Sequence, residues 1–291
     1  MAVTAKQVKE LRDRTGVGMM DAKKALVAVE GDMDKAVDYL RENGLAKADK
    51  KADRIAAEGL TKVVVDGNDA AIVEVNSETD FVAKNDKFIE VLNKVAENIL
   101  ANKPADLDAA LSIDVDGESL ADYLREATSV IGEKISLRRF ETVTKSDDQS
   151  FGTYVHQGGR ISVLTLVEGS DQSVAEQVAM HVGGMKPRFL NEEDVPADVR
   201  EHEKEVLTEQ ALKEGKPANI VEKMIEGRLK KFFAEICLVD QKFLLDDSQT
   251  VSEFAAAHDS KVLSFVRYEV GEGMQKREEN FADEVASQMG K

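Results

Sequence analysis

The chain has 291 residues and is acidic, with 39 Lys and Arg against 56 Asp and Glu, a net charge of −17. This length predicts about two domains, and a hydrophobic content of 42% is sufficient for packed cores and argues against wholesale disorder. Phosphate backbones and anionic lipid surfaces are bound through clustered Lys and Arg. The charge therefore argues against direct nucleic-acid binding and against a membrane surface as partner.

Cysteine and histidine usage argues against disulfides and metal sites. The single cysteine, Cys237, can form neither an internal disulfide nor a thiolate zinc site. The chain is charged within its first six residues, and no apolar run approaches the ~20 residues of a membrane span. We therefore expect a soluble, cytoplasmic protein without cofactor or metal. The four histidines show no metal-ligand spacing and are His156, His181, His202 and His258.

Residues 1–45 predict three short helices. A capping box at residues 4–7 begins the first helix, and Val8 and Leu11 form its inner face. The third helix is expected over residues 34–43, where Gly44 would end it.

A composition shift then predicts a domain boundary. Residues 46–58 form a charged, helix-prone linker without a long apolar face. Residues 1–55 carry 12 basic and 10 acidic side chains, a net charge of +2, which leaves −19 on the remainder.

The middle of the chain repeats a hairpin followed by a helix, which predicts an α+β fold with antiparallel sheets covered by helices. A third hairpin is expected at residues 236–245 around Asp240, followed by a helix with a capping box at residues 250–253. Further strands are expected at 137–143 and 262–270. The two repeats comprise strands 60–65 and 71–76 with helix 85–100, and strands 153–156 and 161–167 with helix 171–183.

Residues 198–214 and 218–233 predict two antiparallel helices that protrude as a hairpin, because only the turn at 215–217 separates them. Residues 274–291 could form one amphipathic helix. The expected seam of the hairpin is weak on the first helix and clear on the second; it comprises Val199, His202, Val206 and Gln210, then Val221, Met224, Ile225, Arg228 and Phe232.

No phosphate loop, dinucleotide fingerprint, HExxH or GxSxG motif is present, which disfavours an enzyme. A lone helical histidine such as His181 is more often a satisfied core or surface residue than a base. Arg138 and Arg139 are expected on a solvated sheet edge.

One connection is unusually long. The loop at 76–84 has about nine residues, whereas the matching connection at 168–170 has about three. Either Thr79 or Asp80 caps a helix and Phe81 packs beneath it, or Asp80 and Phe81 are presented to a partner. Spacing alone favours the first interpretation.

Two long segments make the chain resemble the elongation factor Ts family. Residues 11–26 (LRDRTGVGMMDAKKAL) and 74–84 (EVNSETDFVAK) match its two signature sequences. The resemblance covers essentially the whole chain and extends to residues 154–160, 181–182, 215–217 and 265–273.

The resemblance implies a guanine-nucleotide exchange factor that binds elongation factor Tu with GDP, dislodges Mg²⁺ and promotes GDP release during translation elongation. It also implies a three-helix module like a ubiquitin-associated domain, a core of two subdomains and a coiled-coil hairpin. The corresponding segments are 1–55 for the module with its linker, 56–144 for the N subdomain, 145–187 and 234–273 for the C subdomain, 188–233 for the hairpin and 274–291 for a C-terminal helix.

The resemblance also implies contact residues and reverses the preference for a packed Phe81. In the family, the aromatic side chain inserts between two helices of the GTPase domain. Methionine at helical spacing is usually core filler, so only one of Met19 and Met20 need be exposed. The turn after Tyr154 has one more residue than in some members of the family. This difference affects how His156 aligns with the family's Tyr-x-His position. The implied contacts are Thr79, Asp80, Phe81 and Val82 for Mg²⁺ dislocation, and Arg12, Met19, Met20 and His156 elsewhere.

The main alternative is a non-catalytic binding scaffold or chaperone-like adaptor that uses the three-helix module. An unrecognised enzyme and a nucleic-acid binder rank lower. The sequence leaves open whether the protein forms a homodimer or a 2:2 complex with its partner, and what the helical hairpin does.

Overall fold

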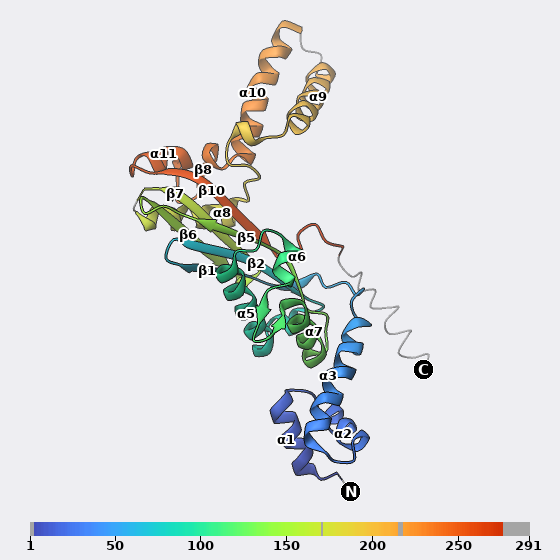
Figure 1. Ribbon diagram of the computed structural model, residues 1–291. Coiled ribbons are helices and arrows are strands. Elements are labelled where there is room, and N and C mark those ends of the chain that lie inside the picture. Colours follow the sequence, from blue (N-terminus) through green and yellow to red (C-terminus); the bar gives the residue numbers. More distant parts are fainter. Residues whose placement is uncertain (1–2, 170, 215–217, 276–291) are drawn as a thin grey trace. The chain divides into compact units, whose positions relative to one another are not determined.

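The computed structural model describes residues 3–169, 171–214 and 218–275 (Figure 1). The chain divides into two compact units. The first comprises the chain up to Val64, Ala71–Thr142 and the chain from Tyr268, and the second comprises Val65–Ala70 and Val143–Arg267. Both combine sheets with helices, which confirms the predicted α+β class.

Three helices open the first unit: α1 (Ala5–Thr15), α2 (Met19–Ala28) and α3 (Met33–Asp49). The predicted capping box is present. The Thr4 side chain accepts from the Gln7 backbone N–H, and the Gln7 side-chain oxygen accepts from the Thr4 backbone N–H. Their shared core includes the fully buried side chains of Leu11, Ala22, Ala25, Leu26 and Ala36.

The prediction that Gly44 ends the third helix is wrong, because α3 continues to Asp49. Gly44 is buried, and a Cβ atom there would collide with the Ser129 side chain on α7 (Leu120–Ile131). The glycine therefore serves close helix packing rather than termination. Because α3 continues past Gly44, residues 46–49 of the expected linker are helical.

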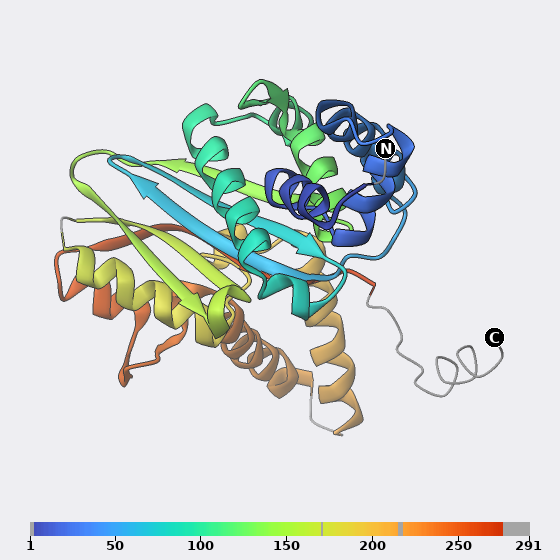
Figure 2. The same ribbon diagram turned by 90° about the horizontal axis from the view of Figure 1, so that it is seen from below.

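The sheet of the first unit has the order β1-β2-β5, from β1 (Glu58–Asp66), β2 (Asp69–Ser77) and β5 (Ser136–Thr144). The predicted hairpin turn between β1 and β2 is confirmed. Helices α5 (Asp86–Asn102) and α7 pack on this sheet around a core that includes Val73, Phe88 and Val95 (Figure 2). The smaller elements are α4 (Asp80–Ala83), α6 (Leu107–Leu111), and the antiparallel pair β3 (Asp114–Val115) and β4 (Glu118–Ser119).

The second unit contains a sheet of order β10-β7-β6. Strands β6 (Gln149–His156) and β7 (Ile161–Glu168) pair antiparallel, with His156 opposite Ile161. Helix α8 (Gln172–Met185) packs on them, and buried Val163, Val178 and Phe243 belong to the core. Strand β10 comprises Lys261–Glu269, and this unit also contains η1 (Gln157–Gly159), η2 (Glu192–Asp194) and α11 (Val251–Ala256).

The predicted third hairpin is misplaced. Ile236 ends α10 (Ala218–Ile236), Asp240 closes a 3-10 turn, η3 (Leu238–Asp240), and the hairpin lies further on, between β8 (Lys242–Phe243) and β9 (Asp246–Thr250). The apolar run before Asp240 continues a helix, and periodicity cannot separate a short buried strand from a helix end. The capping box at Thr250 is confirmed.

The helical hairpin consists of α9 (Ala197–Lys213) and α10, which contact each other. The predicted seam on α9 is wrong in part: His202 and Gln210 are exposed, whereas Leu207 and Ala211 are buried. On α10, Val221 and Ile225 are buried as predicted. The predicted turn at 215–217 lies outside the described residues, as does almost all of the helix expected at 274–291. Within the described ranges, no helix is long and apolar enough to cross a membrane.

Candidate functional site

The long loop of the first unit presents an exposed aromatic side chain. Strand β2 ends at Ser77, and the short helix α4 follows before α5 begins. Thr79 caps α4, its Oγ1 accepting from the Val82 backbone N–H at 3.3 Å. Phe81 is 81% exposed, more than any other large apolar side chain in the described residues. Thr79 therefore caps a helix, as one interpretation held, but Phe81 does not pack beneath it.

The residues that follow Phe81 anchor the loop. Ala83 is buried, and Val82 packs against the core of the first unit. Lys84 Nζ lies 2.7 Å from Asp80 Oδ2, one helical turn away. Both side chains are largely exposed, so this pair contributes little to stability but orients Asp80 beside Phe81. Val82 and Ala83 thus attach the turn to the core of the first unit, while Phe81 extends into solvent.

A carboxylate from another part of the chain fixes the start of this loop. Glu133 lies between α7 and β5, and its Oε2 accepts from the backbone N–H groups of Glu78 (3.1 Å) and Thr79 (2.9 Å). Its Oε1 accepts from Thr79 Oγ1 at 2.7 Å. The sequence analysis missed Glu133, since no local pattern relates a residue to a loop 54 positions earlier.

The contact between the two loops is reciprocal. Glu78 Oε1 accepts from the Lys134 backbone N–H at 2.7 Å, and Arg54 Nη1 approaches Glu78 Oε2 at 3.2 Å. The Glu78 side chain is only 12% exposed, so these bonds are shielded more than an ordinary surface pair. Residues 78–79 and 133–134 therefore hold each other in place.

The predicted contacts on the three-helix module lie at its surface. Met19 and Met20 begin α2 and are 45% and 63% exposed, so both methionines lie at the surface and neither is core filler. The core-facing side of α2 is formed instead by Ala22, Ala25 and Leu26. Arg12 is half-buried on α1 and pairs with Asp13 at 2.6 Å.

His156 belongs to the second unit and is exposed at the end of β6. Its Nδ1 lies 3.1 Å from the Tyr154 hydroxyl, and the two rings stack with centroids 5.9 Å apart. The Tyr-x-His pair therefore forms a small aromatic surface. The structure gathers residues 79–82 in one loop, while His156 lies on a different unit from them.

His181 has no catalytic geometry. It is fully buried, accepts from the Leu244 backbone N–H at Nδ1 (3.0 Å), and bonds Gln241 Oε1 through Nε2 (2.9 Å). An acceptor at Nδ1 requires the neutral ring, and burial lowers the pKa of His181 in the same direction. His181 is a satisfied core residue, as its pattern indicated.

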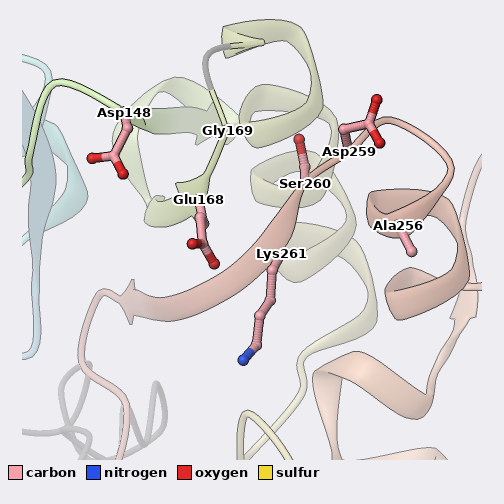
Figure 3. Close-up of a pocket in the computed structure, with 7 residues that line it drawn as sticks. All are labelled: Asp148, Glu168, Gly169, Ala256, Asp259, Ser260 and Lys261. Atoms are coloured by element: carbon pink, nitrogen blue, oxygen red, sulfur yellow. The ribbon is translucent and has the colours of Figure 1, made fainter.

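In the part of the chain that the structure describes, acidic side chains do not converge on a site. A pocket of about 370 Å³ in the second unit is lined by Asp148, Glu168 and Asp259 (Figure 3), but their carboxylates point in different directions. Across the described ranges, no group of three or more acidic, histidine or cysteine side chains could hold a metal ion. The distinctive feature of the described chain is thus an exposed aromatic on a fixed turn.

An α+β fold that presents an exposed aromatic side chain on a fixed turn suits the class of proteins that act through contact with a partner protein. The family model for Elongation factor TS matches residues 78–272. The chain is 57% identical over 289 residues to Elongation factor Ts of Pediococcus pentosaceus, which covers 99% of both chains. It is 56% identical to that of Limosilactobacillus fermentum over 99% of both chains, and 57% identical to that of Lacticaseibacillus casei over 99% of this chain and 98% of the relative.

The chain belongs to the elongation factor Ts family. It is accordingly a nucleotide exchange factor for elongation factor Tu in translation, and it is not an enzyme. Exchange requires contact with the GTPase but no covalent chemistry by the factor itself.

Proposed function

We propose that the protein releases GDP from elongation factor Tu by inserting Phe81 between two helices of the GTPase domain. Asp80 acts beside it, and the resulting shift dislodges the Mg²⁺ bound with the nucleotide. The observation that carries this proposal is the 81% exposure of Phe81 on a turn whose neighbours are fixed. An aromatic side chain held in water by a rigid support is suited to burial in a partner's groove.

Phe81 alone cannot supply a tight complex. Fully burying one Phe side chain contributes ~1.5–3 kcal/mol, and about 1.4 kcal/mol corresponds to tenfold in affinity. One side chain thus changes binding by about one to two orders of magnitude. We propose that the other contacts come from Thr79 and Val82 in the loop, Arg12, Met19 and Met20 on the module, and His156 on the second unit.

The mechanism is a coupling of two binding equilibria on the GTPase. Mg²⁺ bridges phosphate oxygens to the protein in such GTPases, so displacing its ligands weakens the hold on GDP without contact between the factor and the nucleotide. Linkage makes the effect reciprocal: GDP weakens binding of the factor by the same ratio. A factor of this kind needs no phosphate loop of its own.

Assembly and location are part of the same proposal. We place the activity in the cytoplasm, where translation elongation takes place. Whether the protein acts as a homodimer or in a 2:2 complex with elongation factor Tu stays a prediction, and light scattering of the purified complex would measure it.

The test is Phe81→Ala in a stopped-flow assay of labelled GDP release from elongation factor Tu. We expect release to slow by about ten- to hundredfold at limiting factor, while thermal stability stays nearly unchanged because the side chain is exposed.

The matched control is Leu107→Ala, which truncates another exposed apolar side chain of the first unit, 39% exposed on α6. This variant should release GDP at the wild-type rate. An unchanged rate in Phe81→Ala, or an equal loss in both variants, would remove the proposed role of Phe81.

A further inference from the structure

We infer that Glu133 is a positioning residue for exchange: it fixes the loop that presents Phe81 before the partner arrives. The inference rests on the proposed function of Phe81. Its observation is the convergence of three donors, the backbone N–H groups of Glu78 and Thr79 and the hydroxyl of Thr79, on one carboxylate.

The backbone at residues 78 and 79 needs an acceptor. Strand β2 ends at Ser77, so the ladder of the sheet no longer pairs the N–H groups that follow. Helix α4 begins at Asp80, and its own hydrogen bonds start beyond these residues. Partly buried N–H groups that lack partners are costly, and Glu133 Oε2 pairs both.

Thr79 transmits this anchor to Phe81. Its hydroxyl donates to Glu133 and accepts from the Val82 backbone N–H. Because the hydroxyl proton points to Glu133, a lone pair of the same oxygen is directed at the Val82 N–H and caps α4. Helix α4 has only four residues, too few to be stable by itself. The direction of Phe81, the second residue of that helix, therefore depends on a cap that Glu133 holds in place.

The support of Glu133 is itself rigid. Gly132 ends α7 in the left-handed conformation with φ 91°, and the buried Ile135 donates its N–H to Thr128 Oγ1 at 3.0 Å. The Lys134 N–H returns a hydrogen bond to Glu78. A loop already ordered in the unbound protein loses less entropy on association, which is the advantage that Glu133 provides.

The test compares two substitutions of similar size. Glu133→Met removes the acceptors, whereas Glu133→Gln keeps a carbonyl oxygen for the two N–H groups and an amide that can donate to Thr79 Oγ1. We expect Glu133→Met to slow GDP release from elongation factor Tu about tenfold at limiting factor. Glu133→Gln should stay within about threefold of wild type.

A double-mutant cycle with Phe81→Ala separates positioning from a general structural role. If Glu133 acts through Phe81, Glu133→Met should cause no further loss in the Phe81→Ala background. Hydrogen exchange at the amides of Glu78 and Thr79 should accelerate in Glu133→Met and remain slow in Glu133→Gln. Should Glu133→Met not fold, Glu133→Ser removes the carboxylate without placing a long apolar side chain there, and the same cycle applies.

Two results would overturn the inference: wild-type exchange by Glu133→Met, or an equal loss from it with and without Phe81. Failure of the proposed function looks different. In that case Phe81→Ala alone exchanges normally, while the accelerated amide exchange at residues 78 and 79 in Glu133→Met still shows the anchor.

Discussion

At the scale of single residues, the carboxylate of Glu74 is a charge fully buried in β2. It accepts from the Gly271 N–H (2.9 Å), Arg138 Nη1 (2.9 Å), Arg139 Nε (2.6 Å) and Asn76 Nδ2 (3.1 Å). Burial alone would raise the pKa of Glu74, but these hydrogen bonds outweigh it and lower the pKa below its usual 4.5. Glu74 thereby ties the chain at Gly271 to the sheet of the first unit.

Glu74→Gln should destabilise the protein by about 2–4 kcal/mol at pH 7, because it leaves two arginines without their buried partner. The folded-state pKa is lowered, so the stabilisation by Glu74 is complete above pH 4.5 and is lost as pH falls through the folded-state value. Denaturant unfolding at pH 7 and below pH 4.5 should therefore show a large difference between variant and wild type that shrinks in acid. A difference that is the same at both pH values would contradict this account.

The same residues show what a local pattern cannot reveal. Arg138 and Arg139 were expected on a solvated edge, and β5 is indeed an edge strand. Their side chains are only 22% and 29% exposed because both pair with Glu74, 64 and 65 residues earlier. Phe81 was identified through a family signature, and spacing alone favoured the opposite orientation. Glu133 had no signal at all, since its partners become neighbours only when β5 and β2 lie in one sheet.

At the scale of elements, the second unit depends on the close approach of α8 to β6. A Cβ atom at Gly152 would overlap the Ala175 carbonyl group on α8. That carbonyl accepts from Thr165 Oγ1 on β7 at 2.9 Å, so it cannot move away without breaking a buried hydrogen bond. The helix and the two strands are thus joined at a point that admits only glycine.

Gly152→Ala should destabilise the second unit by about 3 kcal/mol through overpacking. The control is Gly227→Ala on α10, where an added Cβ meets no atom within 4 Å. At that exposed helical position alanine should stabilise by about 0.5–1 kcal/mol. Urea unfolding followed by circular dichroism measures both. Equal effects of the two substitutions would mean that α8 can shift to accommodate a methyl group.

Several elements were predicted correctly from local signals. The β1–β2 turn, the capping boxes at Thr4 and Thr250 and the apolar face of α5 all follow from spacing over a few residues. Gly44 shows why other boundaries failed. A glycine after an apolar helical stretch usually ends the helix, but here the contact with Ser129 of α7 requires it within the helix. Tertiary packing decided that boundary.

At the scale of the whole molecule, the predicted contacts are distributed over both units. Phe81 and Met20 belong to the first unit and His156 to the second. A net charge of −17 gives no general affinity for phosphate, so the recognition that we propose depends on these local surfaces. Burial of a single Phe side chain contributes only ~1.5–3 kcal/mol. We therefore expect the contribution of Phe81 to appear in the rate of GDP release rather than in the total affinity for elongation factor Tu.

Removal of Mg²⁺ tests that contribution. If the factor accelerates release by displacing the metal ion, chelating Mg²⁺ with EDTA should accelerate release by elongation factor Tu alone. The ratio of rates with and without the factor should then fall, and the deficit of Phe81→Ala should shrink with it. Leu107→Ala should follow wild type in both buffers. The melting temperature of the factor, measured in both buffers, controls for an effect of EDTA on its own structure. An undiminished ratio without Mg²⁺ would mean that Phe81 weakens GDP binding by a route that does not involve the metal ion.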